Sequence, residues 1–319
     1  MPGSSGGGPG GGAAPASGAL RRIVGGTAAP GSSRSRPQAA SHTSDAATIE
    51  PGRTPAVYNA RSAGAGPAYG RGMPARLVTI PFSHYCEKAR WALARAGVDF
   101  VEDGHLPIYA YLALRRAGAG RTVPALITSD GAVVADSTDI LRWCDAHGRA
   151  APLAPADLPA AAELEDDFDL HLGPAARRLG YFHLLPSKRG FVELLERGGV
   201  PGWQARSGRL ARPVVVRLIK RGLRIDAAGA ARSRVVVDEA FAKVGALLAD
   251  GRRYLCGDRF TAADLTFAAL AAPVLMPDAY ATAYMPSPAN QPPSFRALVD
   301  ELRATPAGAF GLRIYAEHR

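Results

Sequence analysis

The stretch LVTIPFSHYCEKARWALARAG, residues 77–97, changes from one local pattern to another along its length. Residues 77–80 are apolar or β-branched, which favours a short strand, and Pro81 ends that strand because proline has no backbone N–H. Residues 87–96 space their apolar side chains as a helix does, and Gly97 is a typical helix end. The stretch therefore predicts a strand, a connecting loop and a helix.

The sequence that follows continues this alternation of strands and helices. The elements expected there are a strand over 98–102, a helix over 108–116, strands over 125–128 and 132–135 joined by a turn at Ser129, Asp130 and Gly131, and a helix over 137–147. Turn residues between two β-type runs indicate a hairpin. The order βαβαββα is typical of a thioredoxin-like α/β domain.

A second, all-α domain is expected after the first. Residues 149–159 are rich in Ala and Pro, as linkers are, so the α/β domain is predicted to span 76–148. The pattern is helical over 160–319, and Thr261 with Asp264 has the spacing of a capping box at a helix start. The predicted fold class is thus an α/β thioredoxin-like domain followed by an all-α helical domain.

Residues 1–72 are predicted to form a disordered extension. Gly and Pro make up 24 of these 72 residues, and such a segment cannot bury enough apolar surface to offset its ordering entropy. Two alternatives are an organelle-targeting peptide and translated upstream sequence with the start at Met73. The Gly and Pro content opposes the amphipathic helix of a targeting peptide, so a cytoplasmic location is expected.

The composition excludes several classes of protein. Apolar residues make up 47 % of the chain and charged residues 21 %, which indicates globular domains. The longest apolar stretch, residues 265–276, is shorter than the roughly 20 residues of a membrane-spanning helix. Cys86, Cys144 and Cys256 are odd in number and far apart, which excludes a disulfide framework and a zinc cluster. No metal is therefore expected, and a reducing compartment fits best.

Much of the net charge of +10 is concentrated in two segments. Residues 1–72 hold seven Arg and two acids, and residues 206–234 hold nine basic residues and one acid. In the second segment, one predicted helix face carries Arg217, Lys220, Arg221 and Arg224, and another carries Val214, Val215, Leu218 and Ile219.

Several interpretations of this basic helix stay open. One interpretation is that its charged face is only solvated. Others are that the helix contacts an anionic membrane surface, that it contacts an acidic substrate or partner, or that it is an insertion that narrows a substrate cleft. No aromatic residue occurs within 206–234, so nucleic-acid binding is not expected.

Four landmarks in this order resemble the glutathione S-transferase superfamily. They are Ser83, His84, Tyr85 and Cys86 between the first strand and helix; Thr122, Val123 and Pro124 before the third strand; Asp136 and Ser137 before the third helix; and residues 257–264, GDRFTAAD, in the helical domain. The resemblance extends over residues 76–319.

The resemblance implies a site for glutathione. Ser83 would orient and stabilise the thiolate of glutathione. Val123 and Pro124, whose peptide bond is usually cis in the family, would present backbone groups to the cysteinyl part. Asp136 and Ser137 would hold the γ-glutamyl end. The physical basis for Ser83 is that free backbone N–H groups at a helix N-terminus favour an anion. The alternative is that Ser83 and Ser137 only cap their helices.

The function implied is transfer of glutathione, as co-substrate, to a small electrophile bound in an apolar cleft between the domains. The resemblance also implies a homodimer. One alternative is a non-catalytic scaffold for binding or for a membrane surface. Another is a thiol-disulfide or deglutathionylating enzyme that uses Cys86, although a buried residue is the plainer interpretation of Cys86. Candidates for the cleft are Arg177, Arg178, Tyr181 and His183, which the sequence does not rank.

Overall fold

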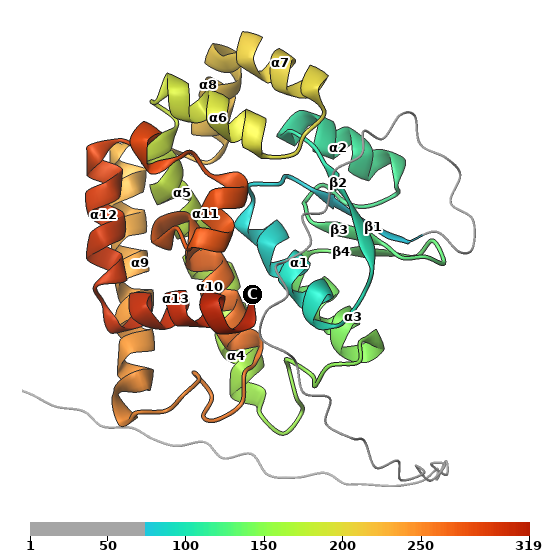
Figure 1. The fold of residues 1–319 in the computed structure, drawn as a ribbon, viewed down its shortest axis with the longest axis vertical. Coiled ribbons are helices and arrows are strands. Elements are labelled where there is room, and N and C mark those ends of the chain that lie inside the picture. The colour runs from blue at the N-terminus through green and yellow to red at the C-terminus, as the bar shows by residue number, and fades with distance from the viewer. Residues whose placement is uncertain (1–73) are drawn as a thin grey trace, which may run out of the picture. The chain divides into compact units, whose positions relative to one another are not determined.

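The computed structural model describes residues 74–319, and its first domain is built on a four-stranded sheet with the order β2-β1-β3-β4. The strands are β1 (Ala75–Thr79), β2 (Phe100–Gly104), β3 (Ala125–Ile127) and β4 (Val133–Ala135). β1 is parallel to β2 and antiparallel to β3, and β3 is antiparallel to β4. The predicted hairpin and the α/β class are confirmed (Figure 1).

Both faces of the sheet are buried against helices, as neighbouring residues of β1 show. The helices of this domain are α1 (His84–Arg95), α2 (Pro107–Arg116) and α3 (Ser137–His147). Leu77 belongs to the main core with residues of α1 and α3, whereas Val78 belongs to a smaller core with Leu114 of α2. Side chains in a strand alternate between faces, so α1 and α3 cover one face and α2 the other.

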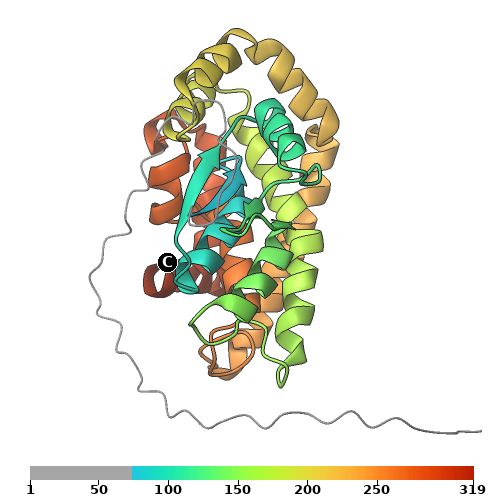
Figure 2. The ribbon, with the colours of Figure 1, turned by 90° about the vertical axis from the view of Figure 1, so that its right-hand side faces the viewer.

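The second domain is helical, as predicted (Figure 2). Its elements are α4 (Pro159–Asp167), η1 (Phe168–Leu172), α5 (Gly173–Leu184), α6 (Lys188–Arg197), α7 (Gly202–Leu210), α8 (Arg212–Gly222), α9 (Ala227–Leu247), η2 (Leu248–Asp250), α10 (Ala262–Leu275), α11 (Asp278–Tyr284), η3 (Pro288–Asn290), α12 (Pro293–Arg303) and α13 (Pro306–His318).

Helix α10 is the core of this domain, because every one of its residues is buried. The predicted capping box at its start is confirmed. The Asp264 carboxylate accepts hydrogen bonds from the backbone N–H of Thr261 at 2.7 Å and of Leu255 at 2.8 Å. The motif therefore holds the start of a buried helix to the preceding loop.

Several predicted boundaries differ from the structure, and two of these differences have a local cause. The first helix begins at His84 and not at residue 87, because Ser83 has an extended backbone and takes the N-cap position. The second strand begins at Phe100 and not at residue 98. Gly97 has a positive φ of 68°, and the N–H of Val98 still donates to the carbonyl of Leu93, so the helix end extends to this point.

Three further predictions concern the disorder of residues 1–72, membrane-spanning helices and metal sites. The predicted disorder of residues 1–72 lies outside the described residues. Within 74–319 no single helix is long and apolar enough to cross a membrane, and only α10 and α11 together, with a bend of 57°, reach that length and composition. In the same range no three His, Cys, Asp or Glu side chains are grouped to hold a metal ion.

Candidate functional site

Three loops meet at one end of the sheet. Val78 of β1 lies opposite Ala125 of β3, and Ala125 lies opposite Ala135 of β4. The chain therefore leaves β1, enters β3 and leaves β4 at the same end. These loops carry the predicted site residues, with Ser83 after β1, Val123 and Pro124 before β3, and Asp136 and Ser137 after β4.

Ser83 takes the N-cap position of α1, but its side chain does not cap the helix. Its carbonyl accepts the Glu87 N–H at 2.9 Å, whereas its hydroxyl bonds none of the backbone N–H groups of the first turn. The hydroxyl lies near the Cys86 thiol and lowers the pKa of that thiol. The backbone N–H groups of the first turn therefore receive no hydrogen bond from the Ser83 side chain. They lie at the N-terminus of the helix, which is the end that favours anions.

Cys86 is fully buried in α1. Burial raises the pKa of its thiol to about 11, although Arg90 and the Ser83 hydroxyl act in the opposite direction. Such a thiol is protonated at neutral pH, and the thiolate is the nucleophilic form. The structure favours the interpretation of Cys86 as a buried residue over direct thiol chemistry.

The Val123–Pro124 bond is cis, as the resemblance implies. Because β3 begins at Ala125, the N–H and C=O of Val123 lie outside the ladder of the sheet. Within the described residues neither group has a backbone partner. The Ser137 hydroxyl is also buried without a hydrogen-bond partner. Buried polar groups in native proteins are nearly always bonded, so the Ser137 hydroxyl marks a place that suits a polar atom of a ligand, beside the free backbone groups of the half-buried Val123.

Asp136, and not Ser137, is the N-cap residue of α3, which corrects the capping alternative for Ser137. Its carboxylate accepts the backbone N–H of Thr138 at 2.9 Å. Its φ of 80° lies in the left-handed region, which Asp tolerates better than most residues. The side chain is exposed, so the carboxylate can still receive a cationic group.

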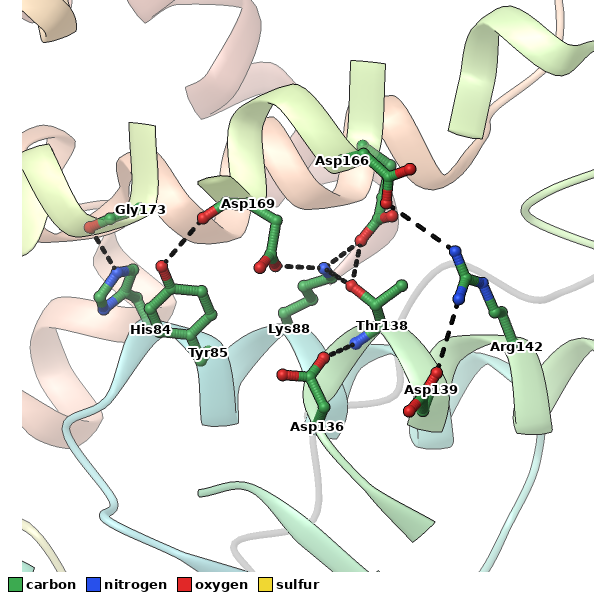
Figure 3. Close-up of polar contacts among 11 residues, drawn as sticks. His84, Tyr85, Lys88, Asp136, Thr138, Asp139, Arg142, Asp166, Asp169 and Gly173 are labelled. Carbon is green, nitrogen blue, oxygen red and sulfur yellow. Dashed lines mark hydrogen bonds and ion pairs between the residues drawn. The ribbon is translucent and has the colours of Figure 1, made fainter. Parts of the chain in front are cut away.

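A buried lysine lies directly beside this loop, and the sequence did not reveal it. The Lys88 Nζ donates to Thr138 Oγ1 at 2.9 Å, to Asp169 Oδ1 at 2.7 Å and to Glu165 (Figure 3). Thr138 Oγ1 in turn donates to Glu165 at 2.6 Å. Lys88 comes from α1, Thr138 from α3, and the two acids from α4 and η1. The cluster therefore connects the two domains and positions the loop that contains Asp136.

Two neighbours of Lys88 on α1 make further contacts with the helical domain. The Tyr85 hydroxyl donates to the backbone carbonyl of Asp169 at 3.1 Å, and His84 Nε2 lies 2.9 Å from the carbonyl of Gly173. Since a carbonyl only accepts, His84 Nε2 carries the proton. Burial, and secondarily Arg177, lowers the pKa of His84 to about 3, so the imidazole is neutral at physiological pH.

These contacts share one side of α1. His84 and Lys88 are four residues apart, a spacing that places side chains on one face of a helix. The predicted helix began at residue 87, which left His84 in the loop and hid this face. Asp169 lies in η1, a π-helical segment that no sequence pattern indicated. Such segments are rare and are frequent at functional sites.

The space beside Ser83 between the domains is small. A hollow of about 10 Å³, room for about one water molecule, is lined by Phe82, His84, Arg177, Gly180, Tyr181, Leu184, Pro273, Tyr280 and Met285. The lining is mainly apolar and aromatic, with Arg177 as its charged side chain.

The structure ranks the candidates for this cleft. Arg177 and Tyr181 line the hollow, and Arg177 Nε is buried without a hydrogen-bond partner. Arg178 instead donates to the carbonyl of Leu223 and to Ser233, and His183 bonds Ser294. Arg178 and His183 thus have structural partners within the helical domain.

Comparison with known proteins adds to this geometry. The family model described as glutathione S-transferase, N-terminal domain, matches residues 82–147, and that described as glutathione S-transferase, C-terminal domain, matches residues 227–305. A search of curated proteins gave no match.

Solved structures were also compared. A glutathione S-transferase of Ceriporiopsis subvermispora in complex with glutathione has a TM-score of 0.51 at 15% identity, over 76% of this chain and 96% of that chain. A glutathione S-transferase of Methylobacterium radiotolerans in complex with glutathione sulfonate has a TM-score of 0.43 at 21% identity, over 75% and 95%. The match to the Ceriporiopsis subvermispora structure supports the fold of this chain and nothing about its function, because the identity is only 15%.

The two family models match in the order of the two domains, and they include the loop with Ser83, the hairpin with Val123 and Pro124, and the buried helix α10. The chain belongs to the glutathione S-transferase superfamily.

Proposed function

We propose that the protein binds glutathione at the end of the sheet where the three loops meet and transfers it to a small electrophile. The thiol lies at Ser83 and the N-terminus of α1. The cysteinyl backbone pairs with Val123, and the γ-glutamyl end lies at Asp136 and Ser137. The exposed Asp136 carboxylate suits the ammonium group of that end.

The observation that carries this proposal is the set of unpaired polar groups at this end. The buried Ser137 hydroxyl has no partner, and an unmade hydrogen bond there costs roughly 1–3 kcal/mol. The N–H and C=O of Val123 have no backbone partner either. A peptide-like ligand with amide and carboxylate groups supplies the missing partners, as glutathione does.

The chemistry belongs mainly to glutathione. A free thiol has a pKa of about 8.5, and each unit by which the site lowers it corresponds to about 1.4 kcal/mol of preferential binding of the thiolate. The helix N-terminus and the Ser83 hydroxyl supply that preference. The thiol proton leaves to solvent, a bond forms between sulfur and the electrophilic carbon, and the leaving group departs with its electron pair.

The hollow beside Ser83 supports a preference among electrophiles. Arg177 is the charged side chain in its lining, because His84 is neutral, and the remaining lining residues carry no charge at neutral pH. We propose that electrophiles with a negatively charged group are favoured. For a carboxylate-bearing electrophile and its neutral methyl ester, we expect Arg177→Gln to raise KM about tenfold for the first only. An equal change for both would contradict this preference.

Calorimetry with the full chain tests glutathione binding. We expect binding of the wild type in the micromolar to millimolar range and a loss of at least about tenfold for Asp136→Ala and Ser137→Ala. Ser129→Ala, at the opposite end of the same hairpin, is the matched control and should bind as the wild type does. Failure of the wild type to bind at millimolar glutathione would overturn the proposal.

Enzyme kinetics of two variants distinguishes the proposed mechanism from the alternative that uses Cys86. In the proposed mechanism Ser83→Ala lowers kcat for conjugation, because the thiolate loses its hydrogen-bond donor, whereas Cys86→Ala leaves a competent site. A thiol-disulfide or deglutathionylating enzyme that uses Cys86 would show the reverse. We place the activity in the cytoplasm, a compartment in which glutathione is kept reduced.

A further inference from the structure

The helices α6, α7 and α8 lie between the two parts of the chain that the family models match. Those models end at residue 147 and resume at residue 227, and they include none of these three helices. Figure 1 shows α6, α7 and α8 grouped together beside α2, and Trp203 of α7 packs edge-on against Tyr109 of α2 at 4.8 Å. Helix α8 has no buried residue. The outward side of this group therefore requires its own explanation.

The apolar side chains of α8 divide between two directions. Val215 and Ile219 pack against the core, as do Val216 and Leu223. Val214 and Leu218 instead point outward, with exposed fractions of 61% and 55%. The predicted apolar face of α8 is therefore only half covered by the core, with Val215 and Ile219 against it and Val214 and Leu218 outside it. Two of the four apolar residues are free for an external partner.

Exposed apolar side chains also occur on α7. Leu210, at the end of α7, is 87% exposed, and Trp203, near its start, is 54% exposed. Trp203 and Leu210 are seven residues apart and so lie on one side of the helix. We call Trp203, Leu210, Val214 and Leu218, with the cations described next, the α7–α8 face.

Three exposed arginines lie among these apolar residues. Arg206 lies between Trp203 and Leu210 on the same side of α7, and Arg217 and Arg221 lie beside Leu218 on α8. Among residues 74–319 none of the three has an ion-pair or hydrogen-bond partner for its guanidinium group. Their charge is therefore not used by the described part of the fold.

Other arginines of the same region differ from these three. Arg209 pairs with Glu196 at 2.9 Å, and Arg212 donates to the backbone carbonyls of Leu185 and Pro186. These two have structural roles. The comparison separates the cations that hold α6, α7 and α8 together from those that face outward.

We propose that the α7–α8 face docks onto the surface of an anionic lipid bilayer. Exposed Leu, Val and Trp side chains enter the boundary between headgroups and acyl chains, while arginines on the same side remain at the level of the anionic headgroups. Arginine and tryptophan also occur in protein–protein interfaces, so the binding experiment below includes an acidic polypeptide as a competing partner. Single-stranded nucleic acid would need a row of aromatic side chains, and the face has one, Trp203.

Vesicle co-sedimentation of the full chain tests the proposal. The probes are vesicles of phosphatidylcholine alone and vesicles with about 30 % phosphatidylserine. We expect binding to the second kind only, and weaker binding at high salt. Each basic residue near an anionic surface changes binding about fivefold, so the triple variant Arg206→Gln, Arg217→Gln and Arg221→Gln should bind about 100-fold more weakly.

The matched control removes the same charge elsewhere. The exposed residues Arg149, Arg253 and Arg259 lie on other parts of the molecule, and the last two pair with Glu317 and Asp157. Their replacement by Gln removes the same net charge and should change vesicle binding by no more than about threefold. Leu210→Gln with Val214→Gln and Leu218→Gln should reduce binding at physiological salt by at least about tenfold while the net charge is unchanged.

Each result has a defined meaning. No binding of the wild type to phosphatidylserine vesicles, or an equal loss in the control triple, would overturn the proposal. So would unchanged binding of the variant that lacks the three face arginines, since the contact would then lie elsewhere. Binding to an acidic polypeptide or to single-stranded DNA without vesicle binding would assign the face to those partners instead. Glutathione affinity should be the same in all variants.

Discussion

Lys88 and the arginines of the α7–α8 face have the same sign of charge and opposite surroundings. Lys88 is 0% exposed and contacts two carboxylates and a hydroxyl, whereas Arg206, Arg217 and Arg221 are exposed and unpaired. A charge inside a protein must be compensated by its neighbours, because water is absent. A charge at the surface is compensated by water and stays available to a partner. The two regions thus use charge for domain packing and for an external contact.

The largest effect should follow from breaking the buried cluster. Lys88→Met leaves the carboxylate of Glu165 buried without its cation, and we expect the free energy of unfolding to fall by about 3–5 kcal/mol. Denaturation by urea at pH 7 measures this change.

Two further variants sharpen this test. The double variant Lys88→Met with Glu165→Met removes both charges, and it should recover at least half of the loss because a buried ion pair is often replaceable by apolar residues. Arg217→Met is the exposed counterpart. If Arg217→Met destabilised the protein as much as Lys88→Met, the distinction between the two regions would fail.

The next effect concerns the free energy of unfolding at acidic pH. The pKa of His84 is lowered to about 3 by burial, with Arg177 as a second cause, and the unfolded value is about 6.5. As the pH falls below about 6.5, the unfolded chain takes up a proton that the folded chain does not. The stability that neutral His84 contributes is therefore complete above pH 6.5 and decreases by up to about 1.4 kcal/mol per pH unit below it.

Urea denaturation between pH 7.5 and pH 5 checks the acid effect. His84→Gln keeps a donor for the carbonyl of Gly173 but does not titrate, so its stability should fall less steeply over this range. His147→Gln, at an exposed position, is the control and should keep the slope of the wild type. Equal slopes for His84→Gln and the wild type would show that His84 is not kept neutral by the fold.

A smaller effect is expected at Thr138. Thr138→Val keeps the shape of the side chain but removes a hydroxyl that bonds both Lys88 and Glu165. We expect a loss of about 1–2 kcal/mol in the free energy of unfolding, measured by urea denaturation. Thr305→Val, which removes a hydroxyl from the N-cap of α13, provides a reference for the loss of two local hydrogen bonds, one to the carbonyl of Leu302 and one from the N–H of Gly308. An unchanged stability for Thr138→Val would mean that Lys88 and Glu165 hold the cluster alone.

The smallest effect should occur on the α7–α8 face. Arg217→Gln and Arg221→Gln should each change the free energy of unfolding by less than about 0.5 kcal/mol, because neither side chain has a partner in the described fold. Thermal unfolding in the absence of vesicles measures this. A larger loss would show that these arginines stabilise the fold, and it would weaken the case that they are kept for an external partner.

Several features of the fold and site were predictable from the sequence because their signals are local. The hairpin followed from its turn residues, and the helix over residues 137–147 has the predicted limits. The capping box at Thr261 and Asp264 depends on four consecutive residues. Ser83, Val123 and Asp136 became candidates through the family resemblance, which rests on short motifs beside the ends of predicted strands and helices.

Other features were not predictable because they depend on contacts between distant segments. Lys88 lies 77 residues from Glu165 and 81 from Asp169 along the chain, so no window of sequence contains the cluster. The hollow at Arg177 depends on how α1 packs against α5 and α10. The exposure of Val214 and Leu218 depends on which part of the apolar face of α8 meets the core, and the amphipathic pattern does not decide this.

The sequence by itself determined the order of strands and helices, the family resemblance and the loops that carry the candidate site. The order of elements follows from backbone preferences and turn chemistry, which act over a few residues, and the candidate site follows from short motifs that resemble those of the family. The tertiary structure decided which polar groups are partnered. It made Cys86 a buried thiol, Lys88 a link between domains, Ser137 an unpaired hydroxyl, and the arginines of the α7–α8 face free charges. Burial and pairing are properties of packed elements, and packing joins residues that are far apart in the chain.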